Sequence, residues 1–207
     1  MKGQDLENDV IWNSTQLMQV SKDLASYRYT LAYSLGNLFI MTLMSGGFIL
    51  FEFLEHDTFL FILFWMIISI LSVGIHVYIF RFAFKIVRLG PWVMVYPIVL
   101  SFGYGLNSVL NDLIPYHILW YFLLGLCSLI IGLTIEREHY LAKNLFSRPI
   151  LFLGIVLLVT FPLIWYAIEF YADSQLNLVI GPAFALIFTS LSTSYSIAQA
   201  EKRVITT

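Results

Sequence analysis

The sequence has little charge and almost no cysteine. Only 12% of its 207 residues are Asp, Glu, Lys or Arg, whereas 59% are hydrophobic and the mean hydropathy is +0.84. This composition excludes an ordinary soluble domain. The single cysteine, Cys127, excludes an internal disulfide and a CxxC redox pair. The chain also lacks HExxH, GxSxG and P-loop motifs and any clustered basic stripe. We therefore expect no cofactor, no nucleic-acid partner and no enzyme of those common classes.

Long apolar stretches dominate the chain instead. A helix rises about 1.5 Å per residue, so about 20 apolar residues cross the hydrocarbon core of a bilayer. Six stretches have this length: residues 32–53, 58–80, 92–114, 116–135, 150–171 and 176–198. The sequence therefore predicts an all-α integral membrane protein with a bundle of six transmembrane helices.

Basic residues are missing from three of the five connections between these stretches. All eleven lie before the first stretch or after the second, fourth or sixth: Lys2, Lys22, Arg28, Arg81, Lys85, Arg88, Arg137, Lys143, Arg148, Lys202 and Arg203. The positive-inside rule makes these four segments cytoplasmic. This predicts a multi-pass protein of the cell (plasma) membrane with both termini inside. It comprises a cytoplasmic arm (1–31), a transmembrane domain (32–198) and a short cytoplasmic tail (199–207).

The arm has its own helical pattern at residues 9–29. Its apolar residues recur at a three-four spacing with one polar gap at Asn13: Val10, Leu17, Val20, Leu24 and Tyr27. Asn8 and Asp9 are suitable N-caps. The pattern predicts an amphipathic helix lying along the inner surface of the lipid bilayer. The alternative is that the apolar face packs against a cytoplasmic loop or a partner subunit.

Polar residues inside a bilayer are costly, so each is a candidate for function. The candidates for lining a solute pathway are Asn37, His76, Ser101, Tyr104, Asn107 and Ser108. The alternative for the asparagines and serines is hydrogen bonding between packed helices, and for His76 a structural place near the inner interface. The inner third of the sixth stretch is rich in Ser and Thr, which can bond their own helix or line a hydrated vestibule.

Two groups of polar or amphipathic side chains mark the ends of the stretches. Glu52, His56 and Asp57 at the first outer connection are weak candidates for a divalent cation, but they lack a diagnostic ligand spacing, and no metal site is predicted. Aromatic residues such as Tyr96 and Trp120 lie near predicted span ends, where their rings favour headgroup depth.

The connection after the fourth stretch carries one family resemblance. It reads Glu136-Arg137-Glu138-His139-Tyr140-Leu141-Ala142-Lys143-Asn144-Leu145-Phe146-Ser147-Arg148-Pro149-Ile150. This segment resembles the ABC-2 family of transporter permeases, which have an ERE-type acidic start, a short cytoplasmic helix and an SRP[IV]-like exit. The resemblance implies docking to a cytoplasmic ATPase, with Glu136, Glu138 and Arg148 facing it. Here the segment follows the fourth stretch rather than the second, and Tyr140-Leu141 replaces a Gly-Thr pair. A plain surface helix is the other interpretation.

These observations lead to one expected function and two alternatives. We expect a permease-like transporter subunit that works in a homo- or hetero-oligomer, with an ATPase subunit as the possible cytoplasmic partner. The first alternative is a structural or assembly subunit of a membrane complex that does not transport. The second is an intramembrane lipid-modifying enzyme that uses His76 and the hydroxyl groups of the sixth stretch.

Overall fold

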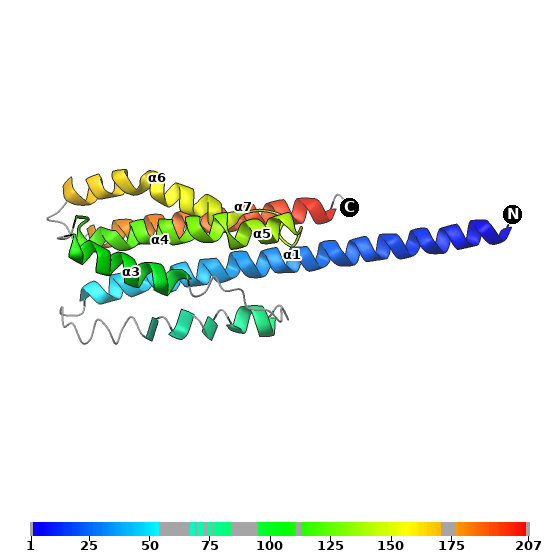
Figure 1. The fold of residues 1–207 in the computed structure, drawn as a ribbon, viewed down its shortest axis with the longest axis horizontal. Coiled ribbons are helices and arrows are strands. Elements are labelled where there is room, and N and C mark those ends of the chain that lie inside the picture. Colours follow the sequence, from blue (N-terminus) through cyan, green and yellow to red (C-terminus); the bar gives the residue numbers. More distant parts are fainter. Residues whose placement is uncertain are drawn as a thin grey trace.

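The structure is a computed structural model that describes residues 2–53, 67–83 without 69, 73 and 76, 95–110, 113–170 and 177–205. Within these ranges the chain is helical apart from short connections, and it contains no strand. The helices, labelled in Figure 1 where there is room, are α1 (Lys2–Phe53), the π-helix η1 (Tyr78–Ala83), α3 (Val95–Val109), α4 (Tyr116–Leu133), α5 (Ile135–Leu141), α6 (Pro149–Phe170) and α7 (Asn177–Ile205).

The helices lie side by side along one long axis (Figure 1). Helix α1 packs against α7, α7 against α6, α6 against α4, and α4 against α3, so the first and last helices are neighbours. The core is apolar and draws mainly on α1, α4 and α6. Its fully buried members include Tyr33, Met41, Ile118, Tyr121, Leu124, Ile131, Leu153 and Leu157. The helices thus form one bundle around a shared core.

Three helices in the described part of the chain are long and apolar enough to cross a membrane. They are α4 together with α5 (Ile118–Leu141), α6 (Pro149–Phe170) and most of α7 (Val179–Ile205). At about 1.5 Å per residue, α6 spans roughly 33 Å, close to the thickness of a hydrocarbon core. This all-helical fold fits the predicted helical membrane protein. The count of six spans stays a prediction, because much of 58–80 lies outside the described residues.

The predicted boundaries of the fourth and fifth stretches agree closely with α4 and α6, and the sixth stretch begins within one residue of α7. The connection between α4 and α6 contains the short helix α5. This helix follows α4 after one non-helical residue, Thr134. Pro149 begins α6, a position where proline loses no helical hydrogen bond. Helix α7 runs beyond residue 198, and its last turn contains Lys202 and Arg203, which a helix C-terminus favours.

The arm differs from the prediction. Helix α1 begins at Lys2, so Asn8 and Asp9 are not N-caps, and it continues unbroken for 52 residues into the first apolar stretch. Residues 4–35 contain neither proline nor glycine, so nothing in the sequence breaks the helix where the arm meets the span. The arm therefore continues along the axis of the rest of α1 and projects beyond the bundle, instead of forming a separate helix (Figure 1).

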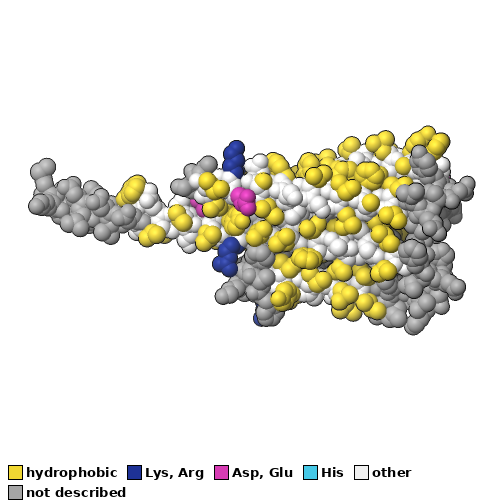
Figure 2. All heavy atoms as spheres, turned by 180° about the vertical axis from the view of Figure 1, so that it is seen from behind, with side chains coloured by type: hydrophobic (Ala, Val, Ile, Leu, Met, Phe, Trp, Pro, Cys, Tyr) yellow, Lys and Arg dark blue, Asp and Glu magenta, His cyan; other side chains and the backbone are white. Residues whose placement is uncertain are grey.

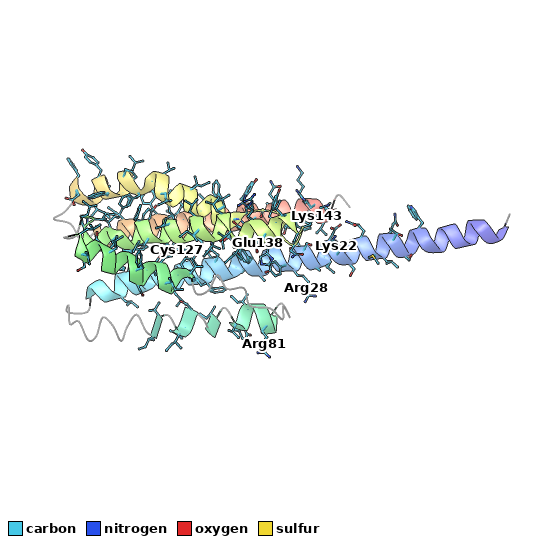
Figure 3. All side chains as sticks on the ribbon, in the orientation of Figure 1. Lys22, Arg28, Arg81, Cys127, Glu138 and Lys143 are labelled. Atoms are coloured by element: carbon cyan, nitrogen blue, oxygen red, sulfur yellow. The ribbon has the colours of Figure 1, made fainter. Side chains whose placement is uncertain are left out.

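Basic residues gather at the end of the bundle from which this arm projects. Figure 3 shows Lys22, Arg28, Arg81 and Lys143 close to one level along the long axis, although they come from α1, η1 and the loop after α5. Figure 2 shows the described Lys and Arg side chains at this end and apolar side chains over much of the rest of the described surface. We call this the basic end. Both termini of the chain extend toward it (Figure 1).

Candidate functional site: buried polar groups in an apolar bundle

Small hydroxyl side chains join the helices near the basic end. Ser34 of α1 donates a hydrogen bond to Ser196 of α7 over 2.9 Å, and Ser196 and Ser147 share another over 2.6 Å. On α7, Thr193 donates to the carbonyl oxygen of Ser34, and Ser192 donates to that of Pro149. All these hydroxyl-bearing residues are buried. We call this group the hydroxyl seam; it connects α1, α7 and the start of α6.

The loop between α5 and α6 is attached to α1 by two further hydrogen bonds. Ser26 donates to the carbonyl oxygen of Lys143 over 2.9 Å, and the backbone N–H of Phe146 donates to the hydroxyl oxygen of Thr30 over 3.2 Å. The guanidinium of Arg203, on α7, lies 5.6 Å from the centre of the Phe146 ring, within the range of a cation–π contact. The loop is thus held between the first and last helices.

Glu136 lies inside the protein, at the junction of α5 and α6. Its carboxylate accepts hydrogen bonds from the backbone N–H groups of Ile150, at 2.9 Å, and Leu151, at 2.7 Å. These N–H groups belong to the first turn of α6, where they have no acceptor in their own helix and where a negative charge is favoured. Burying a carboxylate is costly, and these hydrogen bonds offset the cost. Glu136 therefore caps α6.

This arrangement corrects the predicted partner contacts. Glu136 is completely buried and faces α6, so it does not face a soluble partner. Arg148 is half-buried and donates from its guanidinium to the carbonyl oxygen of Gly132. Glu138 is exposed on α5, close to the basic end (Figure 3). Of the three predicted contact residues, it is the one whose side chain lies on the surface.

A second group of buried polar residues lies deeper in the bundle. Asn37 of α1 is buried, and its Oδ1 accepts a hydrogen bond from the Tyr96 hydroxyl of α3 over 3.4 Å. The Ser128 hydroxyl of α4 lies beside that of Tyr96. We call Asn37, Tyr96 and Ser128 the mid-bundle cluster. Within the described part of the chain, Asn37 Nδ2 and Ser128 Oγ have no partner at hydrogen-bond geometry.

The structure does not bring the predicted pathway residues together. Asn37 lies in the mid-bundle cluster, but Asn107 lies near the other end of α3 and closes the turn after it. Its side chain exchanges two 3.0 Å hydrogen bonds with the backbone of Ile114. Ser101 and Ser108 are exposed, and Tyr104 packs against the apolar core. His76 lies outside the described residues.

The other predicted site residues give a mixed result. The side chain of Glu52, and the whole of His56 and Asp57, lie outside the described part of the chain. Among the residues that are described, no group of three His, Cys, Asp or Glu side chains is placed to hold a metal ion. In α7 the hydroxyl groups of Thr189, Ser192 and Thr193 donate to backbone carbonyl oxygens, two of them on other segments.

Two aromatic residues that lie near predicted span ends belong to the core. Tyr96 and Trp120 are buried among the helices, and their depth in the membrane stays a prediction. Tyr96 and Ser128 thus contribute to the mid-bundle cluster without having been predicted there. The sequence did contain a signal for Ser128, since it is one of the few polar residues in the fourth stretch. It contained no signal that would distinguish Glu136 as a buried helix cap from an acidic residue on the surface.

Comparison of this chain with protein-family models, with curated proteins and with solved structures finds no match.

Proposed function

We propose that the chain is a permease-like subunit of a membrane transporter that works with partner subunits. The observation that carries this proposal is the mid-bundle cluster. Leaving a buried hydrogen-bond donor without an acceptor costs about 1–3 kcal/mol, so such groups in a packed protein require a reason. Inside a membrane, a polar group of this kind is by default a candidate for substrate handling.

The chemistry of the cluster suggests the kind of solute. Asn37 offers an amide donor, and Tyr96 and Ser128 offer hydroxyl groups that both donate and accept. None of these three groups is charged at neutral pH. They come from α1, α3 and α4, so a shift of these helices relative to one another would open or close the cluster. We infer that it suits an uncharged solute with hydrogen-bonding groups.

The surface of α5 supports the proposal of a cytoplasmic partner. Glu138 is exposed there, and Leu141, one helical turn later, is 67% exposed. An exposed large apolar side chain beside a charged one is suited to a protein contact. Because α5 and its loop are held by α1 and α7, a force applied by a partner at α5 would reach both helices.

Copurification tests the partner. The tagged full-length chain is purified from its native membranes in mild detergent, and the recovered proteins are identified by mass spectrometry. We expect a nucleotide-hydrolysing subunit in the wild-type sample, with several-fold lower recovery for Glu138→Lys. The matched control is Glu201→Lys, which changes an exposed acid on α7. Recovery of the chain without such a subunit contradicts the proposal.

The copurified complex then tests the role of the cluster. After reconstitution into liposomes, ATP hydrolysis and uptake of labelled uncharged solutes from a cell extract are measured. We expect Asn37→Leu to reduce uptake, while Ser101→Ala, an exposed position on α3, leaves it unchanged. Equal uptake by both variants argues against a role for the cluster in transport.

A structural or assembly subunit is the second candidate. The hydroxyl seam favours it, because these polar groups bond within the chain and stabilise the bundle instead of lining a path. Stable copurification with a large membrane complex, together with no solute uptake, would identify this function.

A further inference from the structure

The projecting arm of α1 presents an apolar face that no other described part of the chain covers. Leu17 is 72% exposed, Val20 55% and Leu24 50%. Beyond Lys22, toward the N-terminus, no other described segment lies beside α1 (Figures 1 and 3). A single helix that leaves such side chains in water gains no tertiary packing, which is the main source of helix stability in proteins. This face needs an apolar partner.

The spacing of the apolar residues is that of a coiled coil. Val10, Leu17, Leu24 and Leu31 recur every seven residues, and the second core position of each heptad holds Leu6, Asn13, Val20 or Tyr27. A repeat of seven produces a narrow seam that matches another helix, whereas a helix lying on a membrane shows a broader apolar face. Trp12 and Met18, two other large apolar residues that are exposed on the arm, lie on different sides of the helix from this seam.

Position and charge both indicate which helix fills the seam. A heptad is written abcdefg, with a and d as its core positions. In a parallel coiled coil, the residue at g, just before an a position, faces the residue at e on the partner helix, five places later in the sequence. This rule pairs Asp23 with Arg28 and Lys2 with Glu7 of a second copy, and both pairs have opposite charge. The single polar core residue, Asn13, is the kind of residue that sets register in such pairs. Two copies inserted in one membrane in the same orientation have parallel α1 helices.

We propose that the arm of α1 forms a parallel coiled coil with the arm of a second copy of this chain. This pairing lies outside the bundle, at its basic end, and joins the two copies through the aqueous phase. It does not depend on the proposed transport function. The tests below use neither solute flux nor ATP hydrolysis, so they succeed or fail separately from those above.

Disulfide crosslinking tests the pairing in the full-length chain. Cys127 is the sole cysteine and is buried, so Cys127→Ala gives a background without thiols. Into it are placed Leu17→Cys, in the seam, or its neighbour Met18→Cys, which is equally exposed but off the seam. After mild oxidation of native membranes, we expect a crosslinked dimer for Leu17→Cys and at least tenfold less for Met18→Cys. Equal crosslinking of the two, or none for Leu17→Cys, overturns the proposal.

A second pair of variants separates arm pairing from contacts between the bundles. With Val20→Cys as the reporter, we expect Leu17→Lys to abolish the crosslink and Met18→Lys to leave it unchanged. If neither lysine affects the crosslink, then the arms are not held by this seam. If the arm lies on the membrane instead, Leu17→Cys should give no crosslink. A water-soluble maleimide should then label Leu17→Cys in detergent but not in lipid. This result would also overturn the proposal.

Discussion

At the scale of the residue, Glu136 joins the start of α5 to the first turn of α6. It supplies both oxygens to the first turn of α6, from a position 14 residues before Ile150. We expect Glu136→Ala to lower the free energy of unfolding by about 2–3 kcal/mol, because a buried N–H group and a partly buried one lose their acceptor. Glu136→Gln keeps one acceptor oxygen and should cost about half as much. The measurement is the thermal unfolding midpoint of the purified protein in detergent.

The control for this prediction is Glu138→Ala, two residues away on the same helix. Its side chain is exposed, and such surface substitutions usually change stability by less than about 0.5 kcal/mol. If Glu136→Ala and Glu138→Ala unfold at the same temperature, then the capping role assigned to Glu136 is wrong.

Sequence alone can single out residues whose polarity is unusual for their surroundings. Asn37 is a strongly polar group in an apolar stretch, and it proved to be buried with its Oδ1 bonded to another helix. Glu136 was misplaced because its environment depends on which helix packs against it. Asn107 was a pathway candidate, but its side-chain amide forms hydrogen bonds with the backbone of Ile114, seven residues later. This pairing depends on the path of the turn after α3.

At the scale of the element, two glycines allow α4 and α6 to approach closely. A Cβ atom added to Gly154 would lie 2.5 Å from the backbone nitrogen of Leu129, and one added to Gly132 would lie 2.5 Å from the Cα of Leu151. Backbone atoms cannot move aside as flexible side chains do. We therefore expect Gly154→Ala to lower the free energy of unfolding by about 1–3 kcal/mol, as overpacking commonly does, measured by thermal unfolding.

Gly105 on α3 is the matched control. A Cβ atom at this position would meet no described atom within 4 Å. Alanine forms helix more readily than glycine, so Gly105→Ala should leave the unfolding temperature unchanged or raise it slightly. A loss of stability equal to that of Gly154→Ala would mean that the glycine effect is not due to close helix packing.

The hydroxyl seam also belongs to this scale, because it joins α1 to α7. We expect Ser34→Ala and Ser196→Ala to be non-additive, with a coupling energy of about 0.6 kcal/mol, the average for hydrogen bonds between membrane helices. A double-mutant cycle on unfolding free energies measures it. Strictly additive effects would show that the Ser34–Ser196 contact contributes no net stability.

The helices themselves could be predicted well because length, apolarity and a starting proline are local properties. Pro149 begins α6, and α4 and α6 begin and end within a few residues of the predicted spans. The course of α1 could not be predicted in the same way. A three-four spacing shows that one face of a helix is apolar, but it does not say whether that face meets lipid, a loop or another helix. The arm was therefore predicted as a helix, but not as a continuation of the helix that follows it.

At the scale of the whole molecule, the distribution of charge predicts how the bundle would lie in a membrane. The structure brings Arg28, Arg81 and Lys143 to one end, although they are far apart in the sequence (Figure 3). Residues 172–175, which connect the last two predicted spans, contain no Lys or Arg. The positive-inside rule thus predicts that the basic end faces the cytoplasm and that this connection faces outward.

Thiol labelling of sealed cells checks this orientation. In the Cys127→Ala background, Asn144→Cys lies in the exposed part of the loop before α6, and Ser174→Cys lies in the predicted outer connection. A membrane-impermeant maleimide should label Ser174→Cys in intact cells, and Asn144→Cys only after permeabilisation. The basic end holds guanidinium and ammonium groups whose transfer across the bilayer is costly, so the reverse pattern would require them all to be translocated. Labelling of Asn144→Cys from outside would therefore refute both the orientation and any cytoplasmic partner at α5.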